Sequence, residues 1–235
     1  MNPDLLAHYD AMRQAALPQL ALGHPELDTL LDNPAADTRR GITLLARPPQ
    51  PILAALGAII ADFQGLEPAQ YYYPPGDIHL TILSIISCYS GFALTDIEPA
   101  AYGQLVAELL RNVPPLRVRL AGLTASAAGI MAQGFPLNEG LGALRQRLRA
   151  AFQASGLPQS IDQRYRIQTA HATLVRFRAP LRDPARLAAL LRHYEQVPIG
   201  DFEVLATELV FNDWYQRAAH TVLLQRNLLG APVGP

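Results

Sequence analysis

An internal duplication constrains the fold of this chain more than any other feature. The order helix, strand, helix, hairpin occurs twice along the sequence. The caps at Thr95 and Asp183 are 88 positions apart, and the hairpin entries at Leu116 and Phe202 are 86 positions apart. Repetition at nearly constant spacing sets an architecture, and two copies are too few for a solenoid. We therefore predict an α+β fold: a bilobal, duplicated arrangement of two mainly antiparallel sheets with outer helices, related by a pseudo-twofold axis around a central cleft.

Hydrophobic patterning and capping signals place the individual elements. We expect a helix over 3–17, closed by Pro18, and an irregular arm over 18–38. Thr95 starts a capping box, and Asn138 and Asp183 each cap a later helix. The expected strands are 41–46, 77–86, 116–120, 129–135, 167–177, 201–211 and 221–225, and another helix covers 51–63. We expect an N-terminal extension over 1–38 and a single bilobal domain over 39–235, with lobes built mainly from the repeats near 50–136 and 138–227.

Composition argues against several classes of protein. Half of the residues are hydrophobic and only 17% are charged, a balance typical of globular chains. The longest apolar stretch, 52–61, is about half of the roughly 20 residues that a membrane span needs. The single cysteine, Cys88, allows neither an internal disulfide nor a CxxC metal site. A net charge of −1 disfavours a clamp for long nucleic acids. The first residues lack the layout of a secretory signal, so we expect a cytoplasmic protein without membrane contacts.

Two histidine motifs occupy equivalent places in the two copies. His79-Leu80-Thr81-Ile82 lies in the first and His171-Ala172-Thr173-Leu174 in the second, 92 positions apart. Side chains at i and i+2 share one face of a strand, so each histidine should point the same way as its threonine. A single strand histidine is more often a structural residue than a catalyst. Two such motifs in register within a duplicated fold instead indicate one shared site.

The residue types suit acid–base chemistry on a phosphate. Histidine titrates near neutral pH, so one imidazole can take a proton while the other gives one. A threonine hydroxyl beside each histidine can donate to a non-bridging phosphate oxygen. This chemistry needs no metal and no cofactor.

With these motifs the sequence resembles the two-histidine (2H) phosphoesterase superfamily, in particular the branch of 2′-5′ RNA ligase-like proteins and cyclic phosphodiesterases. The resemblance covers about residues 39–229, including HLTI at 79–82, HATL at 171–174 and the ending HTVLLQRNLL at 220–229. It implies a bilobal fold with the motifs on central strands, and hydrolysis or transfer at 2′,3′-cyclic nucleotides or RNA ends. By position, His79 and His171 would be the acid–base pair, and Thr81 and Thr173 would hold the phosphate. The segment 83–98 is longer than is usual in that branch, and the first 38 residues are additional.

Aromatic residues near the motifs are candidates for substrate contact. Tyr73 and Tyr165 precede the two motifs, where each could stack on a nucleobase or simply form part of an aromatic strand edge. Phe177 could line the cleft or belong to the core. Trp214 and Tyr215 lie at the turn of the last hairpin and could either lid a pocket or cover a lobe.

Strand alternation sends Arg176 and Arg178 away from the cleft, so we expect neither to contact phosphate.

The zinc motif HExxH, the Walker A and dinucleotide-binding fingerprints and the GxSxG elbow are missing from the sequence. We expect an enzyme that hydrolyses a small cyclic phosphate without metal. The alternative is a non-catalytic module that binds a nucleotide or an RNA end on the same fold, and a weaker alternative is a binder of lipids or small metabolites.

Overall fold

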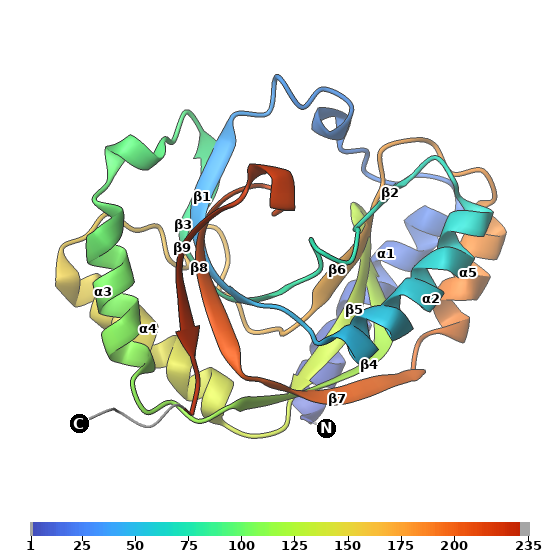
Figure 1. The fold of residues 1–235 in the computed structure, drawn as a ribbon. Coiled ribbons are helices and arrows are strands. Elements are labelled where there is room, and N and C mark those ends of the chain that lie inside the picture. The colour runs from blue at the N-terminus through green and yellow to red at the C-terminus, as the bar shows by residue number, and fades with distance from the viewer. Residues whose placement is uncertain (1, 231–235) are drawn as a thin grey trace.

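The computed structural model describes residues 2–230, which form two antiparallel sheets that face each other, with helices on the outside (Figure 1). The first sheet has the strand order β3-β1-β8-β9, where β1 is Arg39–Ala46, β3 is Leu80–Ser90, β8 is Ala206–Asp213 and β9 is Val222–Leu228. Helices α3 (Pro99–Leu110) and α4 (Gly140–Ser155) lie against its outer side. Helix α4 forms there because its apolar residues recur at helical spacing, which buries Leu141, Leu144, Leu148 and Phe152 on one face.

The second sheet has the order β2-β6-β5-β4-β7. Its strands are β2 (Tyr71–Tyr72), β4 (Leu116–Ser126), β5 (Gly129–Pro136), β6 (Ala172–Arg176) and β7 (Pro198–Val204). Helices α1 (Pro3–Ala21), α2 (Gln50–Leu66) and α5 (Pro184–His193) cover this sheet on the opposite side of the molecule (Figure 1). Three short 3-10 helices lie in connecting segments, at η1 (Thr29–Leu31), η2 (Leu94–Asp96) and η3 (Ala218–His220). The predicted α+β class with two mainly antiparallel sheets is confirmed.

The two sheets repeat one strand order. In the first sheet the order is β3-β1-β8-β9, and in the second the corresponding run is β6-β5-β4-β7. Strand β6, which follows the second histidine, therefore takes the place that β3 takes after the first. Each sheet draws strands from both halves of the chain, because β1 pairs with the early strand β3 and the late strand β8 in the first sheet, while β4 pairs with β5 and the late strand β7 in the second.

The stretch 201–211 is not the single strand that its pattern predicts. It divides at Leu205 into β7, which pairs with β4 in the second sheet, and β8, which pairs with β1 in the first. Both segments have strand patterning, and the sequence carries no glycine or proline between them that would mark the division. The chain thus passes from one sheet to the other across one residue, whose side chain is 57% exposed.

Three helix boundaries also bear on the sequence expectations. Helix α1 continues through Pro18 to Ala21: Pro18 lacks an N–H donor, but its carbonyl still accepts from the N–H of Leu22 at 3.2 Å, so the last turn of the helix forms. Helix α3 begins at Pro99 and not at the capping box of Thr95, which lies in η2. Asp183 caps α5 as predicted, with its carboxylate accepting from the N–H of Arg186 at 3.0 Å.

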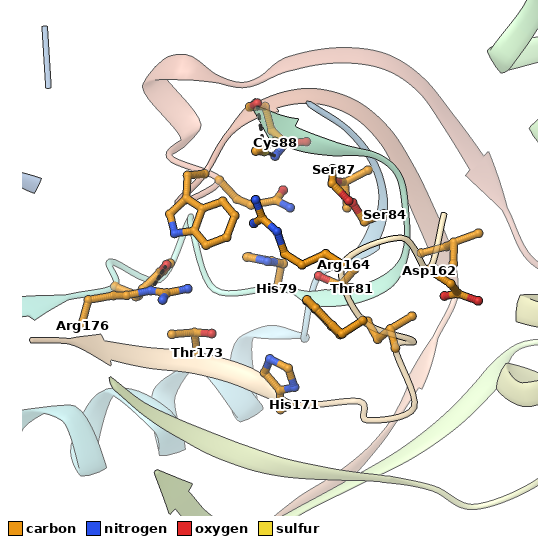
Figure 2. Close-up of a pocket in the computed structure, with 18 residues that line it drawn as sticks. His79, Thr81, Ser84, Ser87, Cys88, Asp162, Arg164, His171, Thr173 and Arg176 are labelled. Carbon is orange, nitrogen blue, oxygen red and sulfur yellow. Dashed lines mark hydrogen bonds between the residues drawn. The ribbon is translucent and has the colours of Figure 1, made fainter. Parts of the chain in front are cut away.

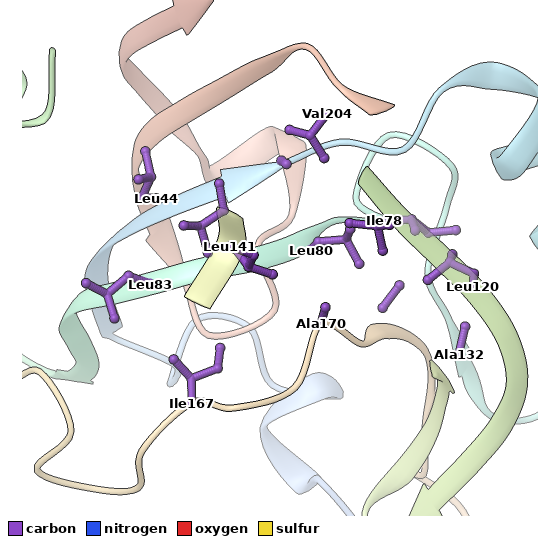
Figure 3. Close-up of a cluster of buried hydrophobic side chains, with 14 of the residues drawn as sticks. Leu44, Ile78, Leu80, Leu83, Leu120, Ala132, Leu141, Ile167, Ala170 and Val204 are labelled. Carbon is purple, nitrogen blue, oxygen red and sulfur yellow. The ribbon is translucent and has the colours of Figure 1, made fainter. Parts of the chain in front are cut away.

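The hydrophobic core runs continuously between the lobes. Side chains from both sheets and from α4 meet in it, among them Leu44, Leu80, Leu120, Ala132, Leu141 and Val204 (Figure 3). Ile78 and Ala170, which each precede a motif histidine, are 1% exposed and belong to this same cluster. The histidines are therefore held by the packed interior and not by a free loop. Across residues 2–230, no helix combines the length and apolarity that crossing a membrane requires.

Candidate active site

All four motif residues line one cavity between the two sheets (Figure 2). The cavity has a volume of about 140 Å³, and His79 and Thr81 reach it from one sheet while His171 and Thr173 reach it from the other. Each histidine is the residue directly before its strand, since β3 starts at Leu80 and β6 starts at Ala172. The two motifs thus enter the cavity from equivalent positions of the duplicated fold.

A β-bulge follows the threonine in both motifs. Leu45 pairs with Thr81 and Leu44 with Leu83, so Ile82 has no partner in β1. In the second sheet Met131 pairs with Thr173 and Ile130 with Val175, which leaves Leu174 unpaired in the same way. The extra residue at the fourth motif position reverses the alternation that follows it.

This reversal corrects the prediction for Arg176. Strand alternation alone directs its side chain away from the cleft, but the bulge at Leu174 brings it onto the face of Thr173, and Arg176 lines the cavity. Ser84 occupies the equivalent place after Thr81 and lines the cavity as well. Arg178 lies outside the cavity, as predicted, and donates to the carbonyl of Ala69 at 2.9 Å.

Both imidazoles use Nδ1 for a contact two residues back along the chain. Nδ1 of His79 lies 2.7 Å from the carbonyl oxygen of Asp77, and Nδ1 of His171 lies 2.7 Å from the hydroxyl oxygen of Thr169. These contacts fix the orientation of each ring and leave Nε2 as the nitrogen available for chemistry. The carboxylate of Asp77 in turn accepts from the N–H of Ala218 at 2.8 Å, which anchors the segment carrying Trp214 beside the first motif.

Enclosure by protein lowers the pKa of both histidines to about 4. Desolvation is the main cause in each case, because the charged imidazolium loses water. For His79 the nearby charges of Arg47 and Arg176 add to this effect, while its contact with the Asp77 carbonyl opposes it. For His171 the neighbouring His79 adds next, followed by Arg176. Both rings are neutral at pH 7 in the free protein.

Arg176 supplies positive charge that the cavity does not neutralise. Its guanidinium donates to the Tyr73 hydroxyl at 3.4 Å, and among residues 2–230 no carboxylate forms an ion pair with it. Asp162 also lines the cavity, but its carboxylate is bound by Arg149 at 2.7 Å. A largely enclosed charge without a counterion is costly, so the electrostatics of the cavity favour negative charge beside Arg176.

Arg145 of α4 joins the two motifs, and sequence reasoning missed it. Its guanidinium donates to the carbonyls of Thr81 and Ile82 in the first motif and to those of Gln168 and Thr169 before the second, over 2.7–3.1 Å. Burial lowers its pKa to about 10. In the sequence it is one more arginine on an amphipathic helix, and only its four partners reveal its role.

The candidate aromatic residues divide between the cavity and the core. Tyr73 is 3% exposed and Tyr165 is 65% exposed, and both line the cavity. Trp214 lines it too, with the guanidinium carbons of Arg39 and Arg164 at 4.7 and 4.8 Å from its ring. The remaining two, Phe177 and Tyr215, are fully buried and do not line the cavity, so Phe177 belongs to the core and Tyr215 forms no lid.

The described part of the chain brings no three His, Cys, Asp or Glu side chains together as a metal-binding group.

No family model matches the sequence, and no curated protein is similar to it at a significant level. Solved structures do resemble it. TT0787 of Thermus thermophilus is 21% identical with a TM-score of 0.58, over 80% of this chain and 97% of that one. A protein described as a phosphoesterase is 18% identical with a TM-score of 0.51, over 81% and 98%. E. coli LigT in complex with 3′-AMP is 16% identical with a TM-score of 0.49, over 81% and 98%.

This chain has the fold of TT0787 and of the solved phosphoesterase. The fold is the bilobal one that the resemblance in the sequence implies, and the match spans nearly the whole of each of those proteins. About a fifth of this chain has no counterpart in them, which leaves room for features of its own.

Proposed function

We propose that this protein is a metal-independent phosphoesterase that hydrolyses a small cyclic phosphate, either a 2′,3′-cyclic nucleotide or the cyclic-phosphate end of an RNA. One observation carries the proposal: two imidazoles, two threonine hydroxyls and the guanidinium of Arg176, which pairs with no carboxylate among the described residues, line a single cavity. These groups supply an acid, a base, neutral hydrogen-bond donors and a positive charge. Together they are what an in-line displacement at a phosphate requires.

Charge complementarity supports an anionic substrate. The guanidinium of Arg176 and the low pKa values of the two histidines both favour a ligand that brings negative charge into the cavity. A bound phosphate diester would provide that charge and would raise the pKa of the neighbouring imidazoles. One histidine could then carry a proton at neutral pH, which acid catalysis at the leaving oxygen needs.

The reaction we propose exchanges one P–O bond for another. Water attacks the phosphorus and gives a proton to the Nε2 lone pair of one histidine. The ring P–O bond breaks, and the leaving oxygen takes a proton from the other histidine. Thr81 and Thr173 donate to non-bridging oxygens, and Arg176 stabilises their developing charge. A bound nucleoside would extend toward the exposed rim, where Tyr165 and Trp214 offer aromatic surfaces.

Initial rates on 2′,3′-cyclic nucleotides and on RNA with a cyclic-phosphate end test the proposal. Replacing His79 or His171 with alanine should lower kcat by about 100-fold or more, since each acts in proton transfer. Thr81→Val or Thr173→Val should cost about 1–3 kcal/mol of transition-state stabilisation. The surface variant His193→Ala, on the outer helix α5, serves as the matched control and should keep the wild-type rate.

The same assay with EDTA examines the role of metal. We expect an unchanged rate, because the chemistry described uses protein groups alone. Loss of activity in EDTA, or activity that persists when both histidines are alanine, would contradict the mechanism. Tight binding of a nucleotide without turnover of any substrate would instead support a non-catalytic binding module.

A further inference from the structure

The cavity continues beyond the motif residues along strand β3. Thr81, Ser84 and Ser87 of this strand all line it, at a spacing of three residues instead of two. Two bulges produce this spacing, because neither Ile82 nor Ile85 has a partner in β1. Each bulge returns the next hydroxyl residue to the face that Thr81 occupies. Figure 2 shows Ser84 and Ser87 on the side of the cavity away from the second motif.

The second sheet has no equal extension. Strand β6 shows the three-residue spacing once, from Thr173 to Arg176, and ends there. Strand β3 continues to Ser90 and thereby adds Ser87 to the cavity wall. The two motifs match each other across the cavity, whereas these extra hydroxyls lie on one sheet only. They therefore face a part of the ligand other than the group that the two motifs hold.

The hydroxyl groups of this extension are available to a ligand. Ser87 gives its backbone N–H to the hydroxyl of Ser160 at 2.7 Å, but within residues 2–230 the side-chain oxygens of Ser84 and Ser87 form no hydrogen bond. Thr43, which pairs with Ser84 from β1, also lines the cavity, and its hydroxyl has no partner in this part of the chain either. Thr43 is 2% exposed, and a buried hydroxyl without a partner is costly, so a ligand that accepts hydrogen bonds is favoured here.

Arg164 reaches the same part of the cavity from the segment between α4 and β6 (Figure 2). Its guanidinium carbon lies 4.8 Å from the centre of the Trp214 ring, and no carboxylate of the described chain forms an ion pair with it. Arg39 contacts the same ring at 4.7 Å, but Asp37 binds it through two hydrogen bonds of 2.8 and 2.7 Å. A contact with an aromatic face leaves the N–H groups of Arg164 free to donate.

This combination of groups favours an anion. Arg164 supplies an unneutralised charge and several N–H donors, and the hydroxyls opposite it supply further donors. The acidic side chain that lines the cavity, Asp162, is bound by Arg149 at 2.7 Å. Arginine and hydroxyl groups together recognise phosphate, because charge-assisted hydrogen bonds to its oxygens are strong.

We infer that Arg164, Ser84 and Ser87 form a second anion subsite, which binds a phosphate of the substrate other than the one that reacts. The inference rests on the proposed function for the identity of that substrate. In a nucleoside 2′,3′-cyclic phosphate, the remaining ribose oxygen that can carry a phosphate is the 5′ oxygen. The preferred substrate therefore carries a 5′ phosphate, either as a terminal group or as the link to the preceding nucleotide of an RNA. Arg164 is the specificity-determining residue.

Calorimetry at pH 7 tests the subsite without any turnover. The ligands are 3′-AMP and adenosine 3′,5′-bisphosphate, which differ only in the 5′ phosphate. Wild type should bind the bisphosphate at least tenfold more tightly, because the subsite adds charge-assisted hydrogen bonds. In Arg164→Met the two affinities should agree within about twofold. Equal affinities in wild type would overturn the inference.

Two further variants separate a built subsite from a general effect of positive charge. Arg166 lies two residues along the same segment and does not line the cavity, so Arg166→Met should keep the tenfold preference. The double variant Ser84→Ala/Ser87→Ala should reduce the preference at least about threefold. An equal loss in Arg166→Met and Arg164→Met, or an undiminished preference in the double variant, would refute the subsite.

Kinetics identify the source of the 5′ phosphate. The substrates are 2′,3′-cyclic AMP, its 5′-phosphorylated form, and the dinucleotide ApA with a 2′,3′-cyclic end. Wild type should have a kcat/KM at least tenfold higher for one or both of the last two than for the first, and Arg164→Met should lose this difference. A higher value for the 5′-phosphorylated mononucleotide alone identifies a free nucleotide, and one for the dinucleotide alone identifies an RNA end.

The failure of this inference is distinguishable from that of the proposed function. Turnover of all three substrates at equal kcat/KM, with equal affinities in calorimetry, would refute the subsite while the protein remains a phosphoesterase. If none of the three is turned over but the bisphosphate still binds tenfold more tightly in an Arg164-dependent way, the proposed function fails and the subsite stands.

Discussion

Acidification should destabilise this protein through its two motif histidines. Each has a pKa of about 4 in the folded state, mainly because of desolvation, against an ordinary value of about 6.5 in the unfolded chain. Well above pH 6.5 the two histidines carry no added proton in either the folded or the unfolded state, so their titration does not change the free energy of unfolding. As the pH falls from 6.5 toward 4, the unfolded chain gains protons that the folded protein excludes, so the free energy of unfolding decreases.

The size of the effect follows from these pKa values. At pH 5 the linkage relation gives a loss of about 2 kcal/mol for each histidine, hence about 4 kcal/mol for the pair relative to pH 7. This is a large part of the roughly 5–15 kcal/mol by which proteins of this kind are stable. Inorganic phosphate at pH 5 should recover some of the loss, because an anion in the cavity raises the pKa of both rings.

Urea unfolding at pH 7 and pH 5, followed by circular dichroism, measures the effect. The control is the double variant His79→Gln/His171→Gln, which keeps polar side chains of similar size but cannot titrate. Wild type should lose about 4 kcal/mol more than the double variant between the two pH values. Equal losses would show that the rings are not desolvated in the folded state, and our account of the electrostatics would then be wrong.

Three substitutions test other parts of the site. Arg145→Met should lower the free energy of unfolding by about 3 kcal/mol or more in urea, because four carbonyls lose their donor and two of these hydrogen bonds are fully buried; a loss below about 1 kcal/mol would contradict this. Gly134→Ala should destabilise the protein and reduce turnover, since an added Cβ would lie 1.9 Å from the carbonyl oxygen of Ala170; a wild-type melting temperature and rate would disprove the close approach. Arg176→Met should weaken binding of inorganic phosphate at least tenfold by calorimetry, and Arg178→Met should not; equal affinities would exclude Arg176 from the anion site.

The sequence predicts the parts of this structure that depend on local pattern. The duplicated order of elements, the fold class and the cap at Asp183 all follow from periodicity and capping chemistry. The histidine and threonine of each motif are two residues apart and precede any irregularity, so strand alternation brings them to one face correctly.

What the sequence does not predict depends on contacts between distant segments. Arg176 lies beyond the bulge at Leu174, and the alternation of residue types along the strand does not reveal a bulge of one apolar residue. Arg145 and Tyr9 act through backbone groups far along the chain, which any sequence can provide. The division at Leu205 arises because two sheets compete for one continuous strand pattern.

The exchange of strands between the sheets governs how this chain can be made. Residue 40 of β1 pairs with residue 213 of β8, so the first sheet cannot close until residue 213 has left the ribosome. Contacts so distant in sequence slow folding, because the conformational entropy of the intervening chain must be lost before the strand pairing can offset that loss. Until β8 is synthesised, the N–H and C=O groups on one edge of β1 have no strand to pair with, and such an exposed edge is prone to aggregation. Neither half of the gene therefore encodes a unit that completes a lobe, although the two halves repeat one plan.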